Sequence, residues 1–284
     1  MPDHTAHNDV LETPDRSARG RPLEQLLAAI RTLKLVGRVV FIHSAWSSAK
    51  PLRIEPLEFL KLLCEAIGPR GTLVMPAYPM TGFSQAYLES NPVFDWEQTP
   101  SRTGLLTELL RSMSGSERSL HPTHSVTARG ALARWITDGH ARSETPFDRH
   151  SPFRKMYDCD AVVVNLGVHL MTFRHLADHR LKAELPHPVY AERIVRVKMI
   201  DRERRVSWTE TRGHNPEYKV DYRHVVQRLR RSGDLVSLRL AGVPVDVIPV
   251  RSFVDSYCRA FRDGDVSFIR REAGDVDAGP VAWS

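Results

Sequence analysis

The chain has 284 residues, of which 42% are hydrophobic and 26% are charged, enough apolar material to bury the core of a globular domain. No run of about eighteen apolar residues occurs, and residues 1–20 are polar with mixed charge. We therefore predict neither a transmembrane helix nor a secretory leader, and expect a cytoplasmic protein. The three cysteines are widely spaced, which excludes a disulfide framework and a thiolate zinc site.

The formal net charge of +6 and a pI near 9.4 would suit nucleic acid, a membrane surface or a small polyanionic ligand. The basic residues come in short groups with acidic residues among them, a pattern typical of a solvated surface. No stripe of alternating basic and aromatic residues and no recognition-helix motif is evident. A non-catalytic or nucleic-acid-binding protein is therefore the weakest of the three functional hypotheses developed below.

Residues 1–20 lack apolar periodicity, so we expect a mobile tail ahead of a single domain over residues 21–284. From residue 22, apolar side chains recur at helical spacing, and Gly37 follows as a stop signal. Residues 39–42 predict a strand that runs into a loop of small residues at 43–48.

The same order repeats in a helix over residues 57–67 and a strand over 72–75. This alternation predicts an α/β layered fold with a largely parallel central sheet flanked by helices. Residues 76–101 are rich in Pro, Gly, Asn and Ser and predict a long loop without regular structure, serving as a lid or as a contact in a homodimer.

The remaining elements complete this architecture. We expect helices over residues 102–113 and 172–181 and a buried strand over 161–166. The last hundred residues predict a smaller, mixed α/β part, with strands near 193–199, 234–240 and 245–250 and helices near 220–230 and 251–262.

The first candidate site segment is the loop at residues 43–48, directly after a predicted strand, where ligands of open α/β sheets usually bind. Its hydroxyls and backbone amides could hold phosphate or an amide-rich chain. It lacks the glycines and the lysine of a P-loop, so a turn with capping serines is the alternative.

The second candidate is the HPTHS segment at residues 121–125. A histidine is a general base near neutral pH, and a neighbouring hydroxyl can donate to a developing oxyanion. The two histidines could equally bond backbone groups of the turn.

The third candidate lies between a strand and a helix at residues 166–178. Thr172 and His175 fall one helical turn apart on one face, as acid–base chemistry requires. Asp178 lies one turn further on and could fix the imidazole tautomer, with Glu210 as its rival. A surface histidine beside an ordinary carboxylate is the alternative.

Metal chemistry is not predicted at this helix. His175 and His179 have the spacing of a helical metal pair, but no glutamate follows His175 and no third ligand is evident.

Together these segments resemble the aminoglycoside 3-N-acetyltransferase family, acetyl-CoA enzymes whose antibiotic N-acetyltransferase fold is distinct from the GNAT fold. The similarity extends weakly to about residue 268. The matching landmarks lie at residues 43–48, 68–76, 99–104, 119–126, 146–152 and 166–178.

The resemblance implies that His175 is the general base, that Thr172 lies near the thioester carbonyl, and that acetyl-CoA is held by two loops. Arg102 is then suited to a phosphate contact. The residues expected to contact acetyl-CoA are His43, Ser44, Ser47, Ser48, Arg102, Thr103, His121, Thr123, His124 and Ser125.

The sequence departs from the family pattern in informative places. Asp178 stands where glutamate is usual, and Arg174 replaces an apolar neighbour of the histidine. Arg212 and His214 lie where the family has acidic residues facing the aminoglycoside. A polycationic substrate needs carboxylates, so these changes favour a less cationic or even anionic amine.

The sequence therefore predicts an N-acetyltransferase that moves an acetyl group from acetyl-CoA to an amine of a small polar molecule. We expect direct attack by the amine while His175 removes its proton, without an acyl-enzyme. The alternative is a biosynthetic acyltransferase or cyclase that uses the same base on a carrier-protein or CoA thioester.

Overall fold

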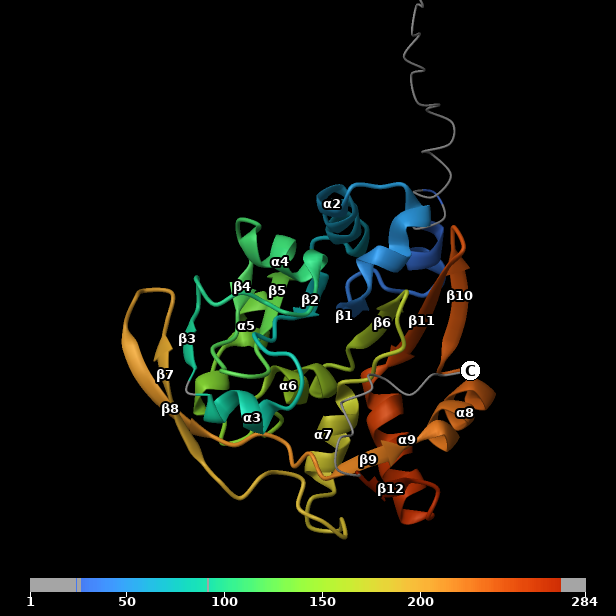
Figure 1. The fold of residues 1–284 in the computed structure, drawn as a ribbon. Coiled ribbons are helices and arrows are strands. Elements are labelled where there is room, and N and C mark those ends of the chain that lie inside the picture. Colours follow the sequence, from blue (N-terminus) through green and yellow to red (C-terminus); the bar gives the residue numbers. More distant parts are fainter. Residues whose placement is uncertain (1–23, 25–26, 91, 272–284) are drawn as a thin grey trace, which may run out of the picture.

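The computed structural model describes residue 24 and residues 27–90 and 92–271 (Figure 1). The predicted tail at residues 1–20 lies outside the described residues, as does the start of the helix predicted from residue 22. Residues 27–32 are helical, and Ile30 is buried. Within the described part of the chain, no helix has the length and apolar character needed to cross a bilayer.

A seven-stranded mixed sheet forms the centre of the molecule, in the order β10-β11-β6-β1-β2-β5-β4. Strand β1 runs parallel to β2 and to β6, and the other four pairings are antiparallel. The strands are β1 (Val39–Ser44), β2 (Thr72–Pro76), β4 (Glu117–Arg118), β5 (Val126–Gly130), β6 (Val162–Leu166), β10 (Val236–Leu240) and β11 (Val243–Pro249).

The prediction of a largely parallel sheet is therefore wrong outside the three central strands. Strands β10 and β11 are joined through Ala241 and Gly242, whose φ values of 48° and 87° suit a tight hairpin turn. A hairpin reverses the chain, whereas a parallel pair needs a long crossover connection. Of the predicted smaller C-terminal part, these two strands extend the central sheet, whereas the other strands of that part belong to two smaller sheets.

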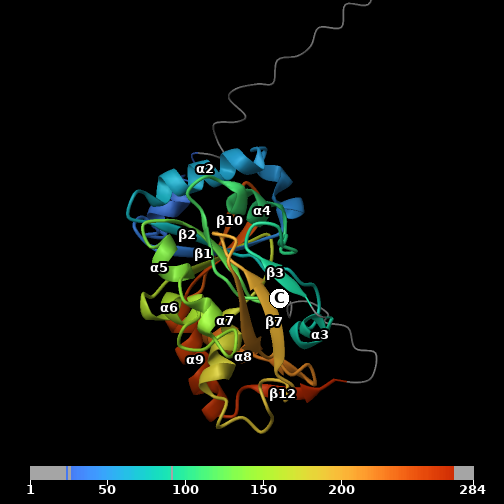
Figure 2. The same cartoon turned by 90° about the vertical axis from the view of Figure 1, so that its left-hand side faces the viewer.

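Two layers of helices cover the central sheet on opposite faces (Figures 1 and 2). Because successive side chains of a strand alternate between faces, Val40 and Ile42 pack into one core while Val39 and Phe41 pack into the other. The first layer holds η1 (Trp46–Leu52), α2 (Pro56–Ile67) and α4 (Leu105–Ser112); the second holds α5 (Ala133–Thr137), α6 (Pro152–Asp158), α7 (Phe173–Arg180), α8 (Arg223–Ser232) and α9 (Val250–Arg262).

A second sheet of three strands lies beside the central one, in the order β3-β7-β8 (Figure 1). Its strands are β3 (Val93–Asp95), β7 (Val195–Ile200) and β8 (Val206–Thr211), and α3 (Ser84–Glu89) packs near it. The remaining elements are the short helix η2 (His140–Arg142) and the strand pair β9 (Tyr218–Asp221) and β12 (Ser267–Arg270).

Elements α3 and β3 correct the prediction that residues 76–101 have no regular structure. Leu88 and Phe94 are fully buried, and they form a small core with Val197 and Met199 of β7. The apolar partners of this segment lie about a hundred residues further along the chain, so its local composition does not reveal them.

Candidate active site

Three chain segments meet where the parallel strands β1, β2 and β6 end. The carboxyl ends of parallel strands lie at one edge of a sheet, the usual place for a ligand. The backbone amide of Ala45, after β1, donates to the carbonyl of Leu166 at the end of β6 (3.1 Å). The amide of Arg102 donates to the carbonyl of Tyr78, which follows β2 (2.7 Å).

The hydroxyl of Thr172 lies at the centre of this edge. Its Oγ1 is 3.1 Å from Nε2 of His43 and accepts a hydrogen bond from the hydroxyl of Tyr78 at 3.5 Å. Burial lowers the pKa of His43 to about 3 and raises the pKa of Tyr78, so both partners are neutral at physiological pH. His43, predicted to touch a cofactor, therefore lies buried against the predicted catalytic threonine.

His175 lies on α7, one helical turn after Thr172, and belongs to a cluster of aromatic rings. Its ring centroid lies 4.1 Å from that of His214, 5.5 Å from Phe147 and 6.4 Å from His124. Burial, followed by the Arg174 guanidinium, holds the pKa of His175 well below its ordinary value. The imidazole is therefore neutral at physiological pH, which is the form able to accept a proton.

The position of His214 depends on a close approach between two segments. The Gly213 amide donates to Oε1 of Gln85 (2.8 Å), and the His214 amide donates to the Ser84 hydroxyl (2.9 Å). A Cβ atom on Gly213 would lie 2.3 Å from the backbone nitrogen of Gln85, so only glycine fits there. The sequence shows His214 where the family has acidic residues, but it does not predict the contact between His214 and His175.

Asp178 does not contact His175 directly, contrary to the prediction. Its carboxylate accepts hydrogen bonds from Nη1 of Arg174 (2.6 Å) and from the hydroxyl of Tyr257 (2.7 Å). The other terminal nitrogen of Arg174, Nη2, lies 3.2 Å from both ring nitrogens of His175. Arg174, four residues before Asp178 on the helix, forms an ion pair with its carboxylate. The guanidinium therefore lies between the carboxylate and the imidazole.

Glu210 is not in the site, so its predicted role as the orienting carboxylate is wrong. It lies on β8 opposite Arg196, exposed to solvent beside a surface hollow of about 550 Å³. Its neighbours Thr209 and Thr211 are buried and donate to backbone carbonyls of residues 141 and 144. The two-residue period of a strand therefore turns Glu210 outward.

The exposed polar groups predicted to hold acetyl-CoA gather at the ends of β1 and β2. Ser47, Ser48 and Arg102 are exposed and Ser44 is partly exposed. Thr103 donates to the carbonyl of Pro76, and its hydroxyl is 2.7 Å from that of Ser101. Next to it Gly104 has a φ of 118°, and a Cβ there would lie 3.9 Å from the Ser44 carbonyl oxygen. The two predicted loops are therefore neighbours.

The predicted cofactor contacts of His121, Thr123 and Ser125 do not fit the structure, because all three are fully buried. Nδ1 of His121 accepts hydrogen bonds from the amides of Thr123 and His124, both at 3.2 Å. The Ser125 hydroxyl donates to the carbonyl of Ser119 (2.6 Å). The segment is a turn held by its own side chains, the alternative that the sequence left open, and His124 faces the ring cluster.

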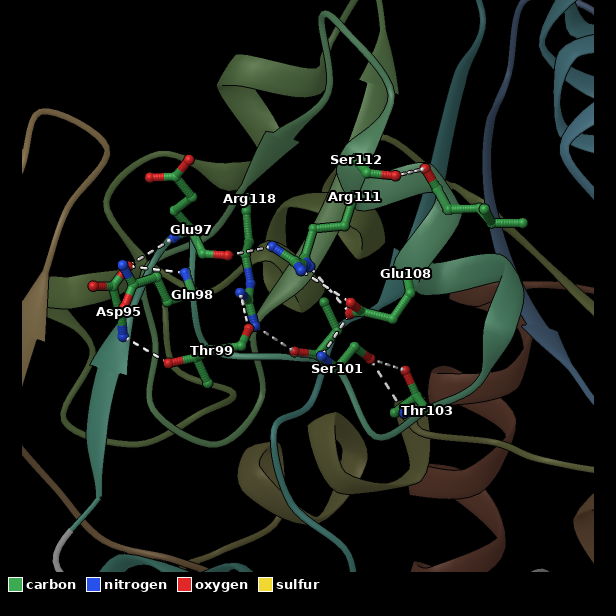
Figure 3. Close-up of polar contacts among 12 residues, drawn as sticks. Asp95, Glu97, Gln98, Thr99, Ser101, Thr103, Glu108, Arg111, Ser112 and Arg118 are labelled. Atoms are coloured by element: carbon green, nitrogen blue, oxygen red, sulfur yellow. Dashed lines mark hydrogen bonds and ion pairs between the residues drawn. The ribbon is translucent and has the colours of Figure 1, made fainter.

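Arg118 is a buried residue that the sequence did not single out (Figure 3). Its guanidinium donates to the carbonyls of Trp96 (3.0 Å), Thr99 (2.6 Å) and Ala77 (3.2 Å). Burial lowers its pKa to about 9. Because these carbonyls flank the segment at residues 99–104, Arg118 fixes the loop that carries Arg102. A lone arginine in a two-residue strand gives no local signal of this role.

Comparison with known proteins identifies one family. The sequence profile of the aminoglycoside 3-N-acetyltransferase family matches residues 41–262. Aminoglycoside N(3)-acetyltransferase IV of Salmonella sp is 28% identical over 222 residues, which are 72% of this chain and 80% of that protein. The SPbeta prophage-derived aminoglycoside N(3')-acetyltransferase-like protein YokD of Bacillus subtilis (strain 168) is 27% identical over 163 residues, 51% of this chain and 60% of that one.

Solved structures share the fold. The apoenzyme of aminoglycoside acetyltransferase AAC(3)-IVa superposes with a TM-score of 0.65 at 23% identity, over 87% of this chain and 89% of that one. The binary complex of AAC-IIIb with CoASH superposes with a TM-score of 0.68 at 21% identity, over 85% of this chain and 96% of that one. The family profile covers more than half of the sequence, and the chain therefore belongs to the aminoglycoside 3-N-acetyltransferase family.

Proposed function

We propose that this protein transfers an acetyl group from acetyl-CoA to an amine of a small polar molecule, with His175 as the general base. The observation that carries the proposal is a continuous set of contacts. Thr172 touches His43, which precedes the serine loop, and Tyr78, whose carbonyl holds Arg102. The residues expected to hold the donor therefore adjoin the residues expected to act on it.

The exposed groups at this edge fit acetyl-CoA. Ser47, Ser48 and Arg102 offer hydroxyls and a guanidinium to a ligand with phosphates and amides. Gly104 is exposed beside them, with no side chain to obstruct the chain of a ligand. When bound, acetyl-CoA supplies an acetyl thioester whose sulfur is the leaving group. A relative of the same fold has been solved with CoASH.

Thr172, which precedes α7, and His175, in the first turn of α7, have separate roles in the reaction. The amide of His175 donates to the carbonyl of Thr172 (3.0 Å), so their relative position is set by the first helical turn. His175 accepts the proton that the amine loses as its nitrogen bonds to the acetyl carbon, a contribution of about 10²–10⁴-fold in rate. Thr172 donates to the carbonyl oxygen of the acetyl group, worth about 3 kcal/mol.

The acceptor is proposed to bind in a hollow of about 300 Å³ that adjoins the ring cluster through His179 and Tyr190. His179 lines it and bonds the hydroxyl of Tyr190 (2.8 Å), whose ring lies 5.2 Å from that of His214. Its lining residues are Arg142, Glu144, Thr145, Asp148, Arg149, His150, His179 and Lys182.

The charges of this hollow favour an acceptor that is less cationic than an aminoglycoside. Arg142, Arg149 and Lys182 are exposed along its lining. Of its two carboxylates, Asp148 already accepts bonds from the Ser143 hydroxyl and from the amides of residues 144 and 150. Few free carboxylate oxygens are left there for several ammonium groups.

The test is an acetylation assay with the purified chain. Acetyl-CoA is incubated with a panel of amines that includes aminoglycosides, neutral amino sugars and amino acids, and products are identified by mass spectrometry. We expect an acetylated product, a loss of at least about 10²-fold in turnover for His175→Ala, and almost unchanged CoA binding. His224→Ala, on the exposed face of α8, is the matched control.

Two outcomes would overturn the proposal. Near-normal turnover of His175→Ala would refute the general base. No acetylated product with any amine would favour acyl transfer from a carrier-protein thioester instead.

A further inference from the structure

The guanidinium of Arg174 lies over the face of the His175 ring. Its Nη2 is 3.2 Å from Nδ1 and 3.2 Å from Nε2. An atom at equal short distances from both ring nitrogens cannot lie in the ring plane, because there it would collide with Cε1. The contact therefore places a guanidinium nitrogen against the face of the imidazole.

The guanidinium is held in place from behind. Its Nη1 donates to Oδ2 of Asp178 at 2.6 Å, and the Tyr257 hydroxyl, from α9, donates to the other oxygen, Oδ1, at 2.7 Å. The side chain of Asp178 is 6% exposed and that of Arg174 is 22% exposed. An ion pair sheltered to this degree, with the carboxylate further bound by a hydroxyl, has a defined geometry.

The other neighbours of the ring supply no negative charge. His214, from the segment after β8, lies at 4.1 Å between centroids, and the rings of Phe147 and His124 lie further out. Asp178 is the carboxylate nearest in this contact network, and the guanidinium separates it from the imidazole. The charged group in direct contact with His175 is therefore a cation.

We propose that Arg174 is a positioning residue that orients the imidazole of His175 and keeps it unprotonated, with Asp178 and Tyr257 holding the guanidinium against the ring. This inference rests on the proposed role of His175 as the base. A protonated imidazole would place a second positive charge in contact with the guanidinium. The base therefore stays available as the solution becomes more acidic.

The test is an NMR titration of the His175 ring in protein labelled at histidine, with the resonance assigned by its loss in His175→Gln. We expect Arg174→Met and Arg174→Gln to raise the pKa of His175 by about one unit or more. Arg174→Lys keeps the positive charge and should stay close to the wild type. Arg180→Met is the matched control, because it removes the Asp255 ion pair of the same helix at a more exposed site.

A further variant separates two possible causes of a raised His175 pKa: loss of the guanidinium charge and exposure of the ring to the unpaired Asp178 carboxylate. Removing Arg174 leaves Asp178 buried and unpaired, and this carboxylate alone would raise the pKa of His175. The double variant Arg174→Met with Asp178→Asn lacks both charges, and we expect its His175 pKa still to exceed that of the wild type. A double variant that titrates like the wild type would overturn the proposal, as would an unchanged pKa in both Arg174→Met and Arg174→Gln.

Kinetics give an independent readout. The acid limb of kcat/KM should move to higher pH in Arg174→Met by the same shift that NMR reports, because the base must be deprotonated to act. Full activity of His175→Ala would refute the general base while leaving the NMR result to decide the role of Arg174. Circular dichroism of each variant checks that it is folded.

Discussion

Thr172 Oγ1 lies 3.1 Å from Nε2 of His43, although 129 residues separate them in the sequence. The pairing of β1 with β6 explains this contact, since His43 is in register with Asn165, a few residues before Thr172. His43 is buried and neutral, so it serves as a hydrogen-bond partner rather than a proton carrier. The arrangement fixes one hydroxyl at the edge of the sheet where the three parallel strands end.

Replacing that hydroxyl should separate catalysis from binding. We expect Thr172→Val to lower kcat by about 10²-fold, because one donor to the carbonyl oxygen is lost. The KM for acetyl-CoA should change little, since the exposed serine loop is untouched. Thr172→Ser keeps the hydroxyl and should retain most of the turnover. Steady-state kinetics decide the point, and normal kcat in the valine variant would exclude a role for the hydroxyl.

Two arginines near the donor loop should behave differently when replaced by methionine. Arg118→Met removes the donor to one buried and two partly buried carbonyls, and we expect the free energy of unfolding to fall by about 3 kcal/mol. Arg102 is exposed, so Arg102→Met should change stability by less than about 0.5 kcal/mol and raise the KM for acetyl-CoA. Urea denaturation and kinetics measure both effects. Equal stability loss in the two variants would contradict this division.

The parts of the fold that the sequence predicted are those with a local period. The helix and strand units at residues 39–76 and 161–181 follow the predicted bounds closely, because their buried faces recur at helical or strand spacing. Elements α3 and β3 were missed since Leu88 and Phe94 are buried by strand β7, far away in sequence. Strands β10 and β11 were predicted, but their antiparallel pairing was not, because a hairpin depends on turn geometry rather than on the order of elements.

The candidate site divides in the same way. Thr172 and His175 were paired from helical spacing, and the backbone bond between them follows from that spacing. The partners of Asp178 were not predicted, since Tyr257 lies 79 residues away and Arg174 competes for the same carboxylate. Helical spacing predicts which residues share one face of a helix, but it does not predict which neighbour forms the ion pair with a carboxylate such as that of Asp178.

The close approach at Gly213 makes another testable position. A Cβ there meets backbone of α3 at 2.3 Å, and backbone cannot move aside as a flexible side chain would. We expect Gly213→Ala to lower the melting temperature and to reduce turnover, because the segment that carries His214 must shift. Gly233→Ala is the control: its φ is 79°, but no atom lies within 4 Å of the new Cβ.

The two variants differ in their causes of instability. Gly233→Ala should cost about 1 kcal/mol from backbone strain alone and leave kcat unchanged. A Gly213→Ala variant with stability and turnover equal to the wild type would show that α3 does not hold His214 in place. Calorimetry and the acetylation assay together measure both quantities.

The buried histidines should make the fold sensitive to acid. Burial lowers the pKa of His43, His124 and His140 to about 3 in the folded state, against the ordinary histidine value of 6.5. The unfolded chain therefore binds more protons than the folded chain between these values, and stability falls as the pH drops below 6.5. Each group contributes about 1.4 kcal/mol per pH unit, or about 4 kcal/mol for three groups at pH 5.5. The raised pKa of Asp178 acts in the opposite direction, but it is one group against seven histidines of the described residues whose pKa burial lowers.

His140 offers a way to isolate one share of this effect. Its Nδ1 lies 3.0 Å from the Ser119 hydroxyl and its Nε2 lies 3.3 Å from the carbonyl of Pro146, a pattern that suits a neutral ring. Glutamine can form both hydrogen bonds and does not titrate, so His140→Gln should lose less stability than the wild type between pH 8 and pH 5.5. The exposed His224→Gln should follow the wild-type profile. Urea denaturation at the two pH values measures the difference, and equal stability of the wild type at both would contradict the burial of neutral histidines.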